Sequence, residues 1–369
     1  MLSHEHRPTP LFELHKKAGG KMTDFAADCL PLSYAGGGML AEHLHTRNLA
    51  SLFDVSHMGQ LCISGDTAVS ALANLVPADV AAIPVGGSRY TVFTNDDGGV
   101  IDDCIIANDG ARGFFIVVNA SRKAIVTANL RAHLPDGCGL QELQEQALLA
   151  LQGPAAVTAL STCLPVAASL RYMRALWTDW RGRACRIARC GYTGEDGFEI
   201  SLPADAASDM AAEMLAQDGV LPAGLGARDS LRLEAGLCLY GNELHEQVTP
   251  VEAGLTWIIP PSRRRGSGYP GAAKISRQIA TGAPYRLVGL VLEGKIPARH
   301  GASLLVNDET VGEITSGLFS PTLQSPIALA RIKNSSPDGE LFAAVRGKRI
   351  AAKIIALPFV KNRTMQGKS

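Results

Sequence analysis

The sequence predicts a mixed α/β protein with a β-rich C-terminal part. Strand-like and helix-like segments alternate over residues 53–134 and again over 141–255, which predicts two α/β units. After residue 260, short β-type segments follow with turn signals between them. The length of 369 residues agrees with two or three domains, at about 150 residues per domain.

The two α/β units follow a mixed N-terminal segment with one helical stretch, residues 42–49. In the first unit, the pattern predicts strands at 60–64, 90–94 and 114–119 and a helix at 66–75. In the second unit, it predicts strands at 147–152, 184–187 and 198–202 and helices at 204–216 and 227–235. The second unit therefore repeats the organisation of the first.

The C-terminal part begins with a breaker-rich basic stretch in which Arg263, Arg264 and Arg265 are consecutive. We expect these arginines to form a solvated linker, and the alternative is an anion site. The β-type runs lie at 285–292, 302–306, 313–316, 327–332, 340–345 and 348–356. They fit a small all-β barrel or sandwich.

The composition excludes several classes of protein. Lys plus Arg and Asp plus Glu each number 35, so no excess of positive charge is available to hold a nucleic acid. The eight cysteines form no CxxC pair, which excludes a zinc ribbon and favours a reducing compartment. No apolar run approaches the roughly 18 residues of a membrane span, and the first residues lack a secretory signal. We expect a soluble, cytoplasmic protein without nucleic-acid or membrane partners.

Asp102 and Asp103 are adjacent acids in a β-branched strand that follows a diglycine turn. Neighbouring residues of a strand face opposite sides, so one acid can be solvated while the other points towards a core or cleft. A carboxylate in such a place is costly unless it is hydrogen-bonded, which makes one of the two a site candidate. The alternative is an edge strand whose acids only discourage aggregation.

Glu199 is a second candidate, at the start of a strand that follows a glycine-rich loop. Alternation places Phe198, Ile200 and Leu202 on one face and Glu199 on the other. If the apolar set is the core, Glu199 is either solvated or faces a groove.

Arg228 and Arg232 form a third candidate, because they share one face of a predicted helix at i, i+4. Such a pair can clamp a carboxylate through bidentate hydrogen bonds. Alternatively, the two arginines can pair internally with Glu234 and Asp229.

Other site motifs are absent or incomplete. His43, His45 and His57 have no metal-ligand spacing on a shared face, and we expect no metal. The GxGxxG at 266–271 does not follow a strand, and the GxxxxGK at 289–295 is followed by isoleucine instead of Ser or Thr. There is no GxSxG elbow, so nucleotide-binding and serine-hydrolase functions lack support.

Eight motifs lie in order along nearly the whole chain. They are SLFDVSHM (51–58), GGVIDD (98–103), LQGP (151–154), GYTGEDGFE (191–199), GARDSLRLEAG (226–236), YGN (240–242), TP (249–250) and GEITSG (312–317). Together they closely resemble the T-protein family of the glycine cleavage system, the aminomethyltransferases.

The resemblance implies an α+β fold in which three domains form a cloverleaf around a central folate channel. Two are mixed α/β domains of ferredoxin-like type with interleaved boundaries, and the last is a small β-barrel. Applied to this chain, the resemblance places the first domain at 1–52 and 141–260 and the second at 53–140. The barrel is expected at 284–369, with 261–283 as a linker.

The resemblance also implies a reaction with two partners. An aminomethyl group on the dihydrolipoyl arm of H-protein loses ammonia, and its methylene carbon passes to tetrahydrofolate as 5,10-methylenetetrahydrofolate. The alternatives are a tetrahydrofolate-dependent demethylase of the same fold and a non-enzymatic folate-binding factor for iron–sulfur maintenance. That factor carries a Lys-Gly-Cys-Tyr type motif, whereas this chain has Leu-Cys-Leu-Tyr-Gly from Leu237.

By position, the resemblance assigns the catalytic role to Asp103, near the reactive folate nitrogens. A fixed carboxylate favours the cationic, iminium-like carbon that develops as ammonia leaves. Asp102 is expected to matter less, because its side chain points the other way. The resemblance assigns folate binding to Glu199, Arg228, Tyr192, Met58, Tyr90, Asn119 and Trp257, and the channel mouth for the lipoyl arm to Arg299. The tail at 361–364 lacks a tyrosine that some members carry, so it is assigned no folate contact.

Overall fold

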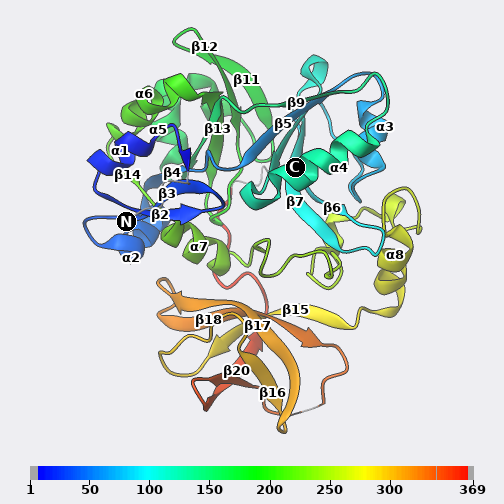
Figure 1. Cartoon of the computed structure of the whole chain (residues 1–369). Coiled ribbons are helices and arrows are strands. Elements are labelled where there is room, and N and C mark those ends of the chain that lie inside the picture. The colour runs from blue at the N-terminus through cyan, green and yellow to red at the C-terminus, as the bar shows by residue number, and fades with distance from the viewer. Residues whose placement is uncertain (1–6, 338, 365–369) are drawn as a thin grey trace.

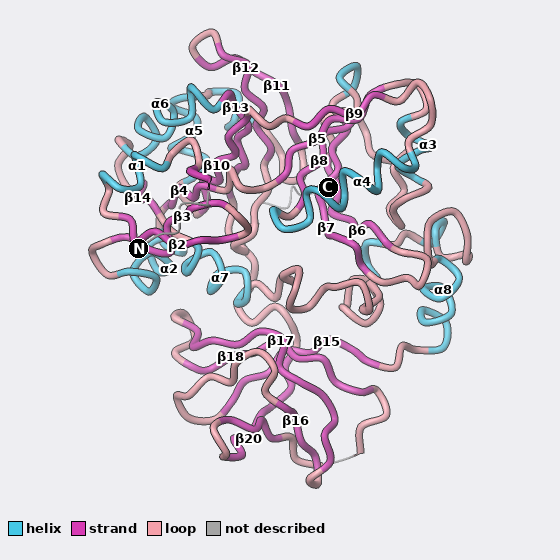
Figure 2. Tube along the Cα trace, in the orientation of Figure 1, coloured by secondary structure: helices cyan, strands magenta, loops and turns pink. Residues whose placement is uncertain are grey.

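A computed structural model describes residues 7–337 and 339–364 of the chain. Two units of sheet and helix lie beside each other, and a β-barrel packs beneath them (Figure 1). Figure 2 shows that most helices lie in the two upper units, that α8 (Ala272–Thr281) lies in the segment leading to the barrel, and that the barrel is made of strands and loops. Among the described residues, none of the helices combines the length and apolarity needed to cross a bilayer.

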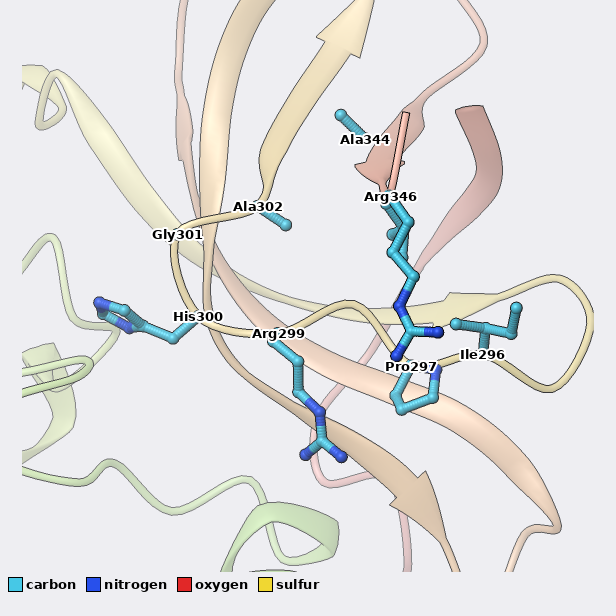
Figure 3. Close-up of a pocket in the computed structure, with 9 residues that line it drawn as sticks. Ile296, Pro297, Arg299, His300, Gly301, Ala302, Ala344 and Arg346 are labelled. Atoms are coloured by element: carbon cyan, nitrogen blue, oxygen red, sulfur yellow. The ribbon is translucent and has the colours of Figure 1, made fainter. Parts of the chain in front are cut away.

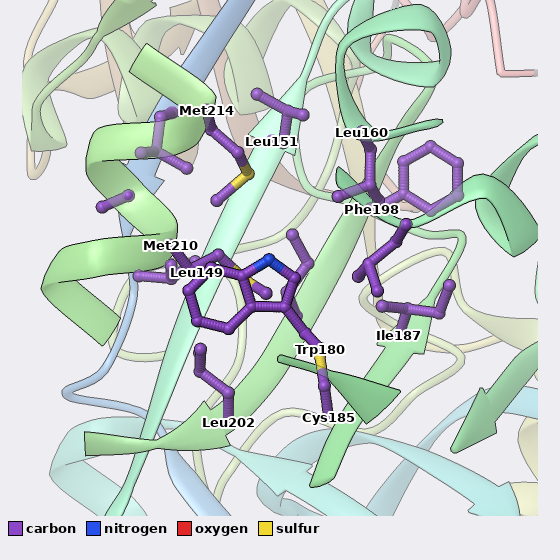
Figure 4. Close-up of a cluster of buried hydrophobic side chains, with 14 of the residues drawn as sticks. Leu149, Leu151, Leu160, Trp180, Cys185, Ile187, Phe198, Leu202, Met210 and Met214 are labelled. Atoms are coloured by element: carbon purple, nitrogen blue, oxygen red, sulfur yellow. The ribbon is translucent and has the colours of Figure 1, made fainter. Parts of the chain in front are cut away.

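The first unit is built on a six-stranded sheet with the strand order β11-β12-β13-β10-β4-β14. Its strands are β4 (Ala50–Asp54), β10 (Gln146–Gln152), β11 (Ala175–Trp180), β12 (Arg183–Ala188), β13 (Gly197–Pro203) and β14 (Val220–Pro222). Helices α5 (Ala156–Cys163) and α6 (Ala204–Leu215) pack on this sheet. The alternation predicted for β13 is correct, because Phe198, Ile200 and Leu202 are fully buried in the core beneath these helices (Figure 4).

A small three-stranded sheet, in the order β1-β3-β2, adjoins the first unit. Its elements are β1 (Arg7–Pro8), α1 (Phe12–Lys17), β2 (Gly20–Phe25), β3 (Asp28–Tyr34) and α2 (Gly38–Asn48). α2 packs against β3 and against α7 (Leu225–Glu234). The buried carboxylate of Glu42 accepts the backbone N–H groups of Tyr34 and Gly224, at 2.5 and 2.8 Å. One side chain of α2 thus fixes the small sheet to the start of α7.

The second unit is built on a five-stranded sheet with the order β6-β7-β8-β5-β9. Its elements are β5 (Gly59–Ser64), α3 (Ala68–Ala73), β6 (Ser88–Thr94), β7 (Val100–Asn108), β8 (Phe114–Val118), α4 (Lys123–His133) and β9 (Gly139–Glu142). β7, which carries Asp102 and Asp103, pairs with β6 on one side and β8 on the other. The edge-strand alternative for these two acids is therefore wrong.

The C-terminal part is a closed barrel in the order β15-β18-β17-β16-β19-β20. Its strands are β15 (Tyr285–Leu292), β16 (Ser303–Val306), β17 (Glu309–Ser320), β18 (Ser325–Lys333), β19 (Phe342–Val345) and β20 (Lys348–Ile355). Closure pairs the first strand with the last, so neither remains an open edge. α7 contacts β17 and β18, which connects the barrel to the first unit.

The predicted fold class, a mixed α/β body with a C-terminal β-barrel, is confirmed. β4 belongs to the same sheet as β10–β14, although the whole second sheet lies between them in the sequence. The domain boundaries stay a prediction. Residues 261–283, expected to be a linker, contain helix α8 (Ala272–Thr281).

The expectation that the arginine run is solvated is wrong for two of its three members. The Arg263 guanidinium donates to the carbonyl oxygens of Ala73 and Val76, at the end of α3. Arg264 Nε donates to the carbonyl oxygen of Ile259 at 2.7 Å. Their partners are main-chain carbonyls, which the sequence pattern alone does not reveal.

Candidate active site

Asp103 is held by donors from the two strands that flank β7. Its Oδ2 accepts the Tyr90 hydroxyl of β6 at 3.0 Å, and its Oδ1 accepts Asn119 Nδ2, just after β8, at 2.7 Å. Burial raises the pKa of the Asp103 carboxyl, and these two hydrogen bonds oppose the rise. Among the described residues, no lysine, arginine or histidine forms an ion pair with Asp103. The carboxylate is therefore fixed in position by neutral groups.

Asp102 is not the solvated partner that strand alternation allows. Its side chain is 0% exposed, and its carboxylate accepts Asn119 Nδ2 at 2.8 Å and the Asn119 backbone N–H at 3.0 Å. Burial and the charge of Asp103 raise the pKa of Asp102 to about 7. Asn119 lies past the end of β8, so its amide reaches both acids from beyond the sheet. Both carboxylates consequently belong to one hydrogen-bonded group.

Glu199 lies on the face of β13 opposite the apolar core. It is half-buried, and the thiol of Cys190 donates to Glu199 Oε2 at 3.5 Å. Glu199 also lies close enough to Arg228 for its charge to raise the pKa of the guanidinium, although burial lowers that pKa overall. Glu199 therefore faces protein groups, and the freely solvated alternative is wrong.

Arg228 and Arg232 have separate environments despite their i, i+4 spacing. The Arg228 guanidinium lies over the ring of Tyr192, 4.8 Å from its centroid, and its Nη1 has no hydrogen-bond partner within residues 7–337 and 339–364. Arg232 is 1% exposed and pairs with Asp229 and Glu243, at 2.8 and 3.1 Å. The two arginines therefore do not form a joint clamp. Internal pairing is correct for Asp229 and wrong for Glu234.

Aromatic and apolar side chains complete this region. The rings of Tyr90 and Trp257 stack at 5.9 Å, and Trp257 is 65% exposed. The Tyr192 hydroxyl donates to the carbonyl oxygen of Cys238. Burial raises the pKa of Tyr192, and the charge of Asp103 adds to the rise, so the two side chains are near each other. Met58 packs on the cluster that contains Ala227 and Leu231 of α7.

The structure thus connects most of the predicted site residues by direct contacts or electrostatic interactions, and these residues come from both upper units. Asp103 joins Tyr90, Asn119 and, through Tyr90, Trp257 by direct contacts. Arg228 joins Tyr192 by a direct contact and interacts electrostatically with Glu199. The individual roles in binding or catalysis stay predictions.

Arg299 lies apart from this group, on the barrel. It is exposed, donates to the carbonyl oxygen of Gly317 at 3.2 Å, and lines a cavity of about 350 Å³. Ile296, Pro297, Gly301 and Arg346 are among the other lining residues. In Figure 3, His300 points away from the two arginine side chains. None of the residues that line this cavity belongs to the Asp103 group.

The sequence did not reveal a buried ionic network beside the site, centred on Glu234 and Glu195. Glu234 is 0% exposed and accepts Arg47 Nη2 at 2.8 Å, His43 Nε2 at 3.1 Å and hydroxyl groups of the barrel. Glu195 accepts Arg47 at 2.7 Å and Arg363 of the C-terminal tail at 2.6 Å. The only signal was a histidine and an arginine, His43 and Arg47, on one face of a short helix.

The histidines have separate roles. His43 bonds to Ser230 and Glu234, and His45 to the carbonyl oxygen of Gly219. Desolvation by burial, together with the charge of Arg228, lowers the pKa of His57 to about 3. In the part of the chain that the structure describes, no three His, Cys, Asp or Glu side chains gather where they could hold a metal ion.

Comparison with known proteins gives consistent matches over nearly the whole chain. The model of the GCVT N-terminal domain matches residues 11–263, and that of the glycine cleavage T-protein C-terminal barrel domain matches 286–361. A mitochondrial aminomethyltransferase of Gallus gallus is 42% identical, over 96% of this chain and 92% of that protein. An aminomethyltransferase of Rubrobacter xylanophilus is 41% identical, over 97% of this chain and 95% of that protein.

A solved structure extends the similarity to three dimensions. The glycine cleavage system aminomethyltransferase T from Bartonella henselae superimposes with a TM-score of 0.91 at 38% sequence identity. The match covers 97% of this chain and 99% of that structure.

Proposed function

The chain belongs to the glycine cleavage T-protein family and is an aminomethyltransferase, and from this premise we propose its two substrates. The donor is the aminomethyl group carried on a dihydrolipoyl arm of H-protein, and the acceptor is tetrahydrofolate. The carbon–sulfur and carbon–nitrogen bonds of the S–CH2–NH2 group break, and the methylene carbon bonds to two folate nitrogens. Their two hydrogens leave with the thiol and with ammonia, so the equation balances without an oxidant.

The observation that carries this proposal is the environment of the Asp103 carboxylate. It is fixed by Tyr90 and Asn119 and is not neutralised by a cation among the described residues. When ammonia leaves, positive charge develops on the methylene carbon and then on the folate nitrogens. A preorganised anion stabilises that charge more than it stabilises the neutral substrates, which lowers the barrier.

The surrounding groups fit a flat, polar heterocycle. Glu199 offers carboxylate oxygens to ring N–H donors, and Arg228 Nη1 is a buried donor without a hydrogen-bond partner among the described residues. A buried donor of this kind is costly until a ligand carbonyl accepts it. The stacked pair of Tyr90 and Trp257 provides an aromatic wall, and Met58 provides an apolar one.

The test combines purified protein, tetrahydrofolate and H-protein loaded with the aminomethyl group. We expect ammonia and 5,10-methylenetetrahydrofolate in equal amounts, and no ammonia without the folate. The Asp103→Asn variant is the matched control for non-enzymatic release. Separate reactions supply a sulfonium or a methylamine in place of H-protein, and folate-dependent demethylation there with no turnover of H-protein would contradict the proposal.

The place of the reaction in the cell stays a prediction. The expected cytoplasmic location rests on the cysteine pattern and on the lack of a recognisable secretory signal and apolar span, and several eukaryotic relatives have names that place them in the mitochondrion.

A further inference from the structure

Asp102 is a second carboxyl group at the site, and the reaction as described does not use it. Asn119 Nδ2 has two hydrogens and lies 2.8 Å from Asp102 Oδ1 and 2.7 Å from Asp103 Oδ1, so one amide group connects the two acids. Asp102 is completely buried, and within the described residues it has no ion pair. Two full negative charges in such a place would repel each other in a medium of low dielectric constant.

We propose that Asp102 is a positioning residue that, through the Asn119 amide, forms a carboxyl pair with Asp103 in which the two acids hold one proton between them. The proposal rests on the proposed function, because it assumes that Asp103 is the carboxylate that faces the reacting carbon. The pair presents a single negative charge there. Loss of the shared proton adds a second charge, and it therefore changes how strongly Asp103 stabilises a cation.

The charged and titratable groups around the pair do not neutralise it. The charge of the Arg122 guanidinium lowers the pKa of Asp102 slightly against the rise, but this guanidinium donates to the Ile101 carbonyl oxygen and to Glu246, at 2.8 and 2.5 Å. The other groups that face the pair are uncharged near neutral pH, because burial raises the pKa of each: Tyr90, Cys104, Tyr192, Cys238 and Tyr240.

Two acids coupled in this way titrate as a pair. The first proton leaves readily, since the other acid is still neutral, and the second leaves at higher pH against the charge already present. The pKa of about 7 for Asp102 agrees with an upper step near neutrality. Each carboxyl should therefore follow a two-step titration curve.

The test is an NMR titration of protein labelled with 13C at the aspartate carboxyl carbons, without substrates. The Asp102 and Asp103 signals are identified by their loss in Asp102→Asn and Asp103→Asn. In the wild-type protein, we expect the chemical shift of the Asp103 signal to change with pH in two steps separated by about one pH unit or more. In Asp102→Asn, the upper step should vanish. A single-step Asp103 curve in the unchanged protein, or an upper step that persists in Asp102→Asn, would overturn the proposal.

The Asn119→Ala variant tests the bridging amide and does not depend on Asp102→Asn being well folded. Loss of the shared donor removes a hydrogen bond that favours the ionised acids, so both signals should titrate at higher pH. If neither curve moves, the amide does not connect the acids and the proposal is wrong.

The pH dependence of kcat connects the pair to the reaction. We expect an inflection at the upper step that Asp102→Asn lacks. Asp109→Asn is the control, since Asp109 is also buried, directly follows β7 and bonds to Arg186 and Trp177 instead of the pair. It should keep the inflection. If the titration curves have two steps but the protein does not turn over loaded H-protein, the proposed function is refuted and the proposal of a carboxyl pair stands. If the curves have a single step and turnover is full, only the proposal of a carboxyl pair is refuted.

Discussion

The protein buries carboxylates in two neighbouring regions, and the two regions differ in the partners that these carboxylates have. In the ionic network of Glu234 and Glu195, arginines pair with the acids, and His43 and hydroxyl groups of the barrel add further hydrogen bonds to Glu234. In the pair of Asp102 and Asp103, the hydrogen-bond partners are an amide, a backbone N–H and a tyrosine hydroxyl.

This difference suggests a division of roles. The charges of the network stabilise the fold, and the charge of the pair remains available to interact with a substrate. A buried carboxylate with a good cationic partner is already satisfied and cannot stabilise a substrate cation. A buried carboxylate with neutral partners retains its field and costs stability. The network accordingly connects α2, α7, the barrel and the tail, while the pair belongs to the candidate site.

The largest effect expected on the network side is a loss of stability in Glu234→Gln. The change leaves Arg47 and His43 buried with a weaker partner, which costs about 3–5 kcal/mol in the free energy of unfolding. Urea denaturation measures it. Asp229→Asn is the matched control on the same helix, because the Asp229 side chain is 53% exposed and its pair with Arg232 should contribute only about 0–1 kcal/mol. Equal losses in the two variants would contradict the role of the network.

In the pair of Asp102 and Asp103, we expect Asp103→Asn to fold normally and to lose most of its catalytic activity. Turnover with loaded H-protein should fall by about 10²-fold or more, as is typical when one preorganised electrostatic group is lost. The free energy of unfolding should stay the same or rise, because a poorly compensated buried charge is removed. Ammonia release and urea denaturation provide the two measurements. Near-normal turnover would exclude Asp103 as the catalytic residue.

The two regions should also respond to pH with opposite signs. The partners of Glu234 hold its pKa at about 2, below the ordinary 4.5, so its stabilisation is complete above 4.5 and is lost as the pH falls through 2. The pKa of Asp102 is raised from 3.8 to about 7, so its contribution is complete below 3.8 and is lost as the pH rises through 7.

Urea denaturation between pH 4 and 7 isolates the second effect. The slope from Asp102 is at most about 1.4 kcal/mol per pH unit. Asp102→Asn should therefore gain stability relative to the unchanged protein as the pH rises over this range. A difference that does not vary with pH would show that Asp102 does not titrate in the folded protein.

The smallest effect expected is on ligand affinity, through Glu199. Glu199→Ala removes an acceptor for ring N–H donors, and we expect tetrahydrofolate to bind about tenfold more weakly, as for the loss of one charged hydrogen bond. Calorimetry measures the change. Glu13→Ala removes the same charge from an exposed position on α1 and should leave the affinity unchanged. Unchanged affinity in Glu199→Ala would refute its assigned role.

Short-range sequence patterns predicted the strands and the residues that face the core. The two-residue period of strands placed Phe198 and Ile200 in the core, and the short β-type runs after residue 260 predicted the barrel strands. The same rule holds along β7, where Asp102 is buried and Asp103 is half-buried, but it did not reveal that the Asn119 side chain reaches both acids. Strand alternation says nothing of a partner that lies past the end of a strand.

Long-range pairing of charges was beyond the sequence pattern. Arg47 bonds to Glu195, 148 positions away, and it also bonds to Glu234, for which the sequence offered only pairing within its own helix as an alternative. The proximity of Asp103 to Asn119 was implied only by the family resemblance, and geometry then supplied the hydrogen bonds. Sequence spacing shows which residues are neighbours on the same helix or strand. The contacts described here depend instead on how separate sheets and helices pack against each other.

The described tail makes part of the first unit depend on residues that follow the barrel. It returns from the barrel to the first unit, where the Val360 backbone N–H donates to the Glu234 carbonyl oxygen and Arg363 bonds to the Glu195 carboxylate. The loop at 191–197 and the end of α7 therefore have their full set of partners only when the tail is docked. Proteolytic cleavage after residue 359 would remove both contacts, and among the described residues Arg47 would then be the remaining cationic partner of the buried Glu195 carboxylate.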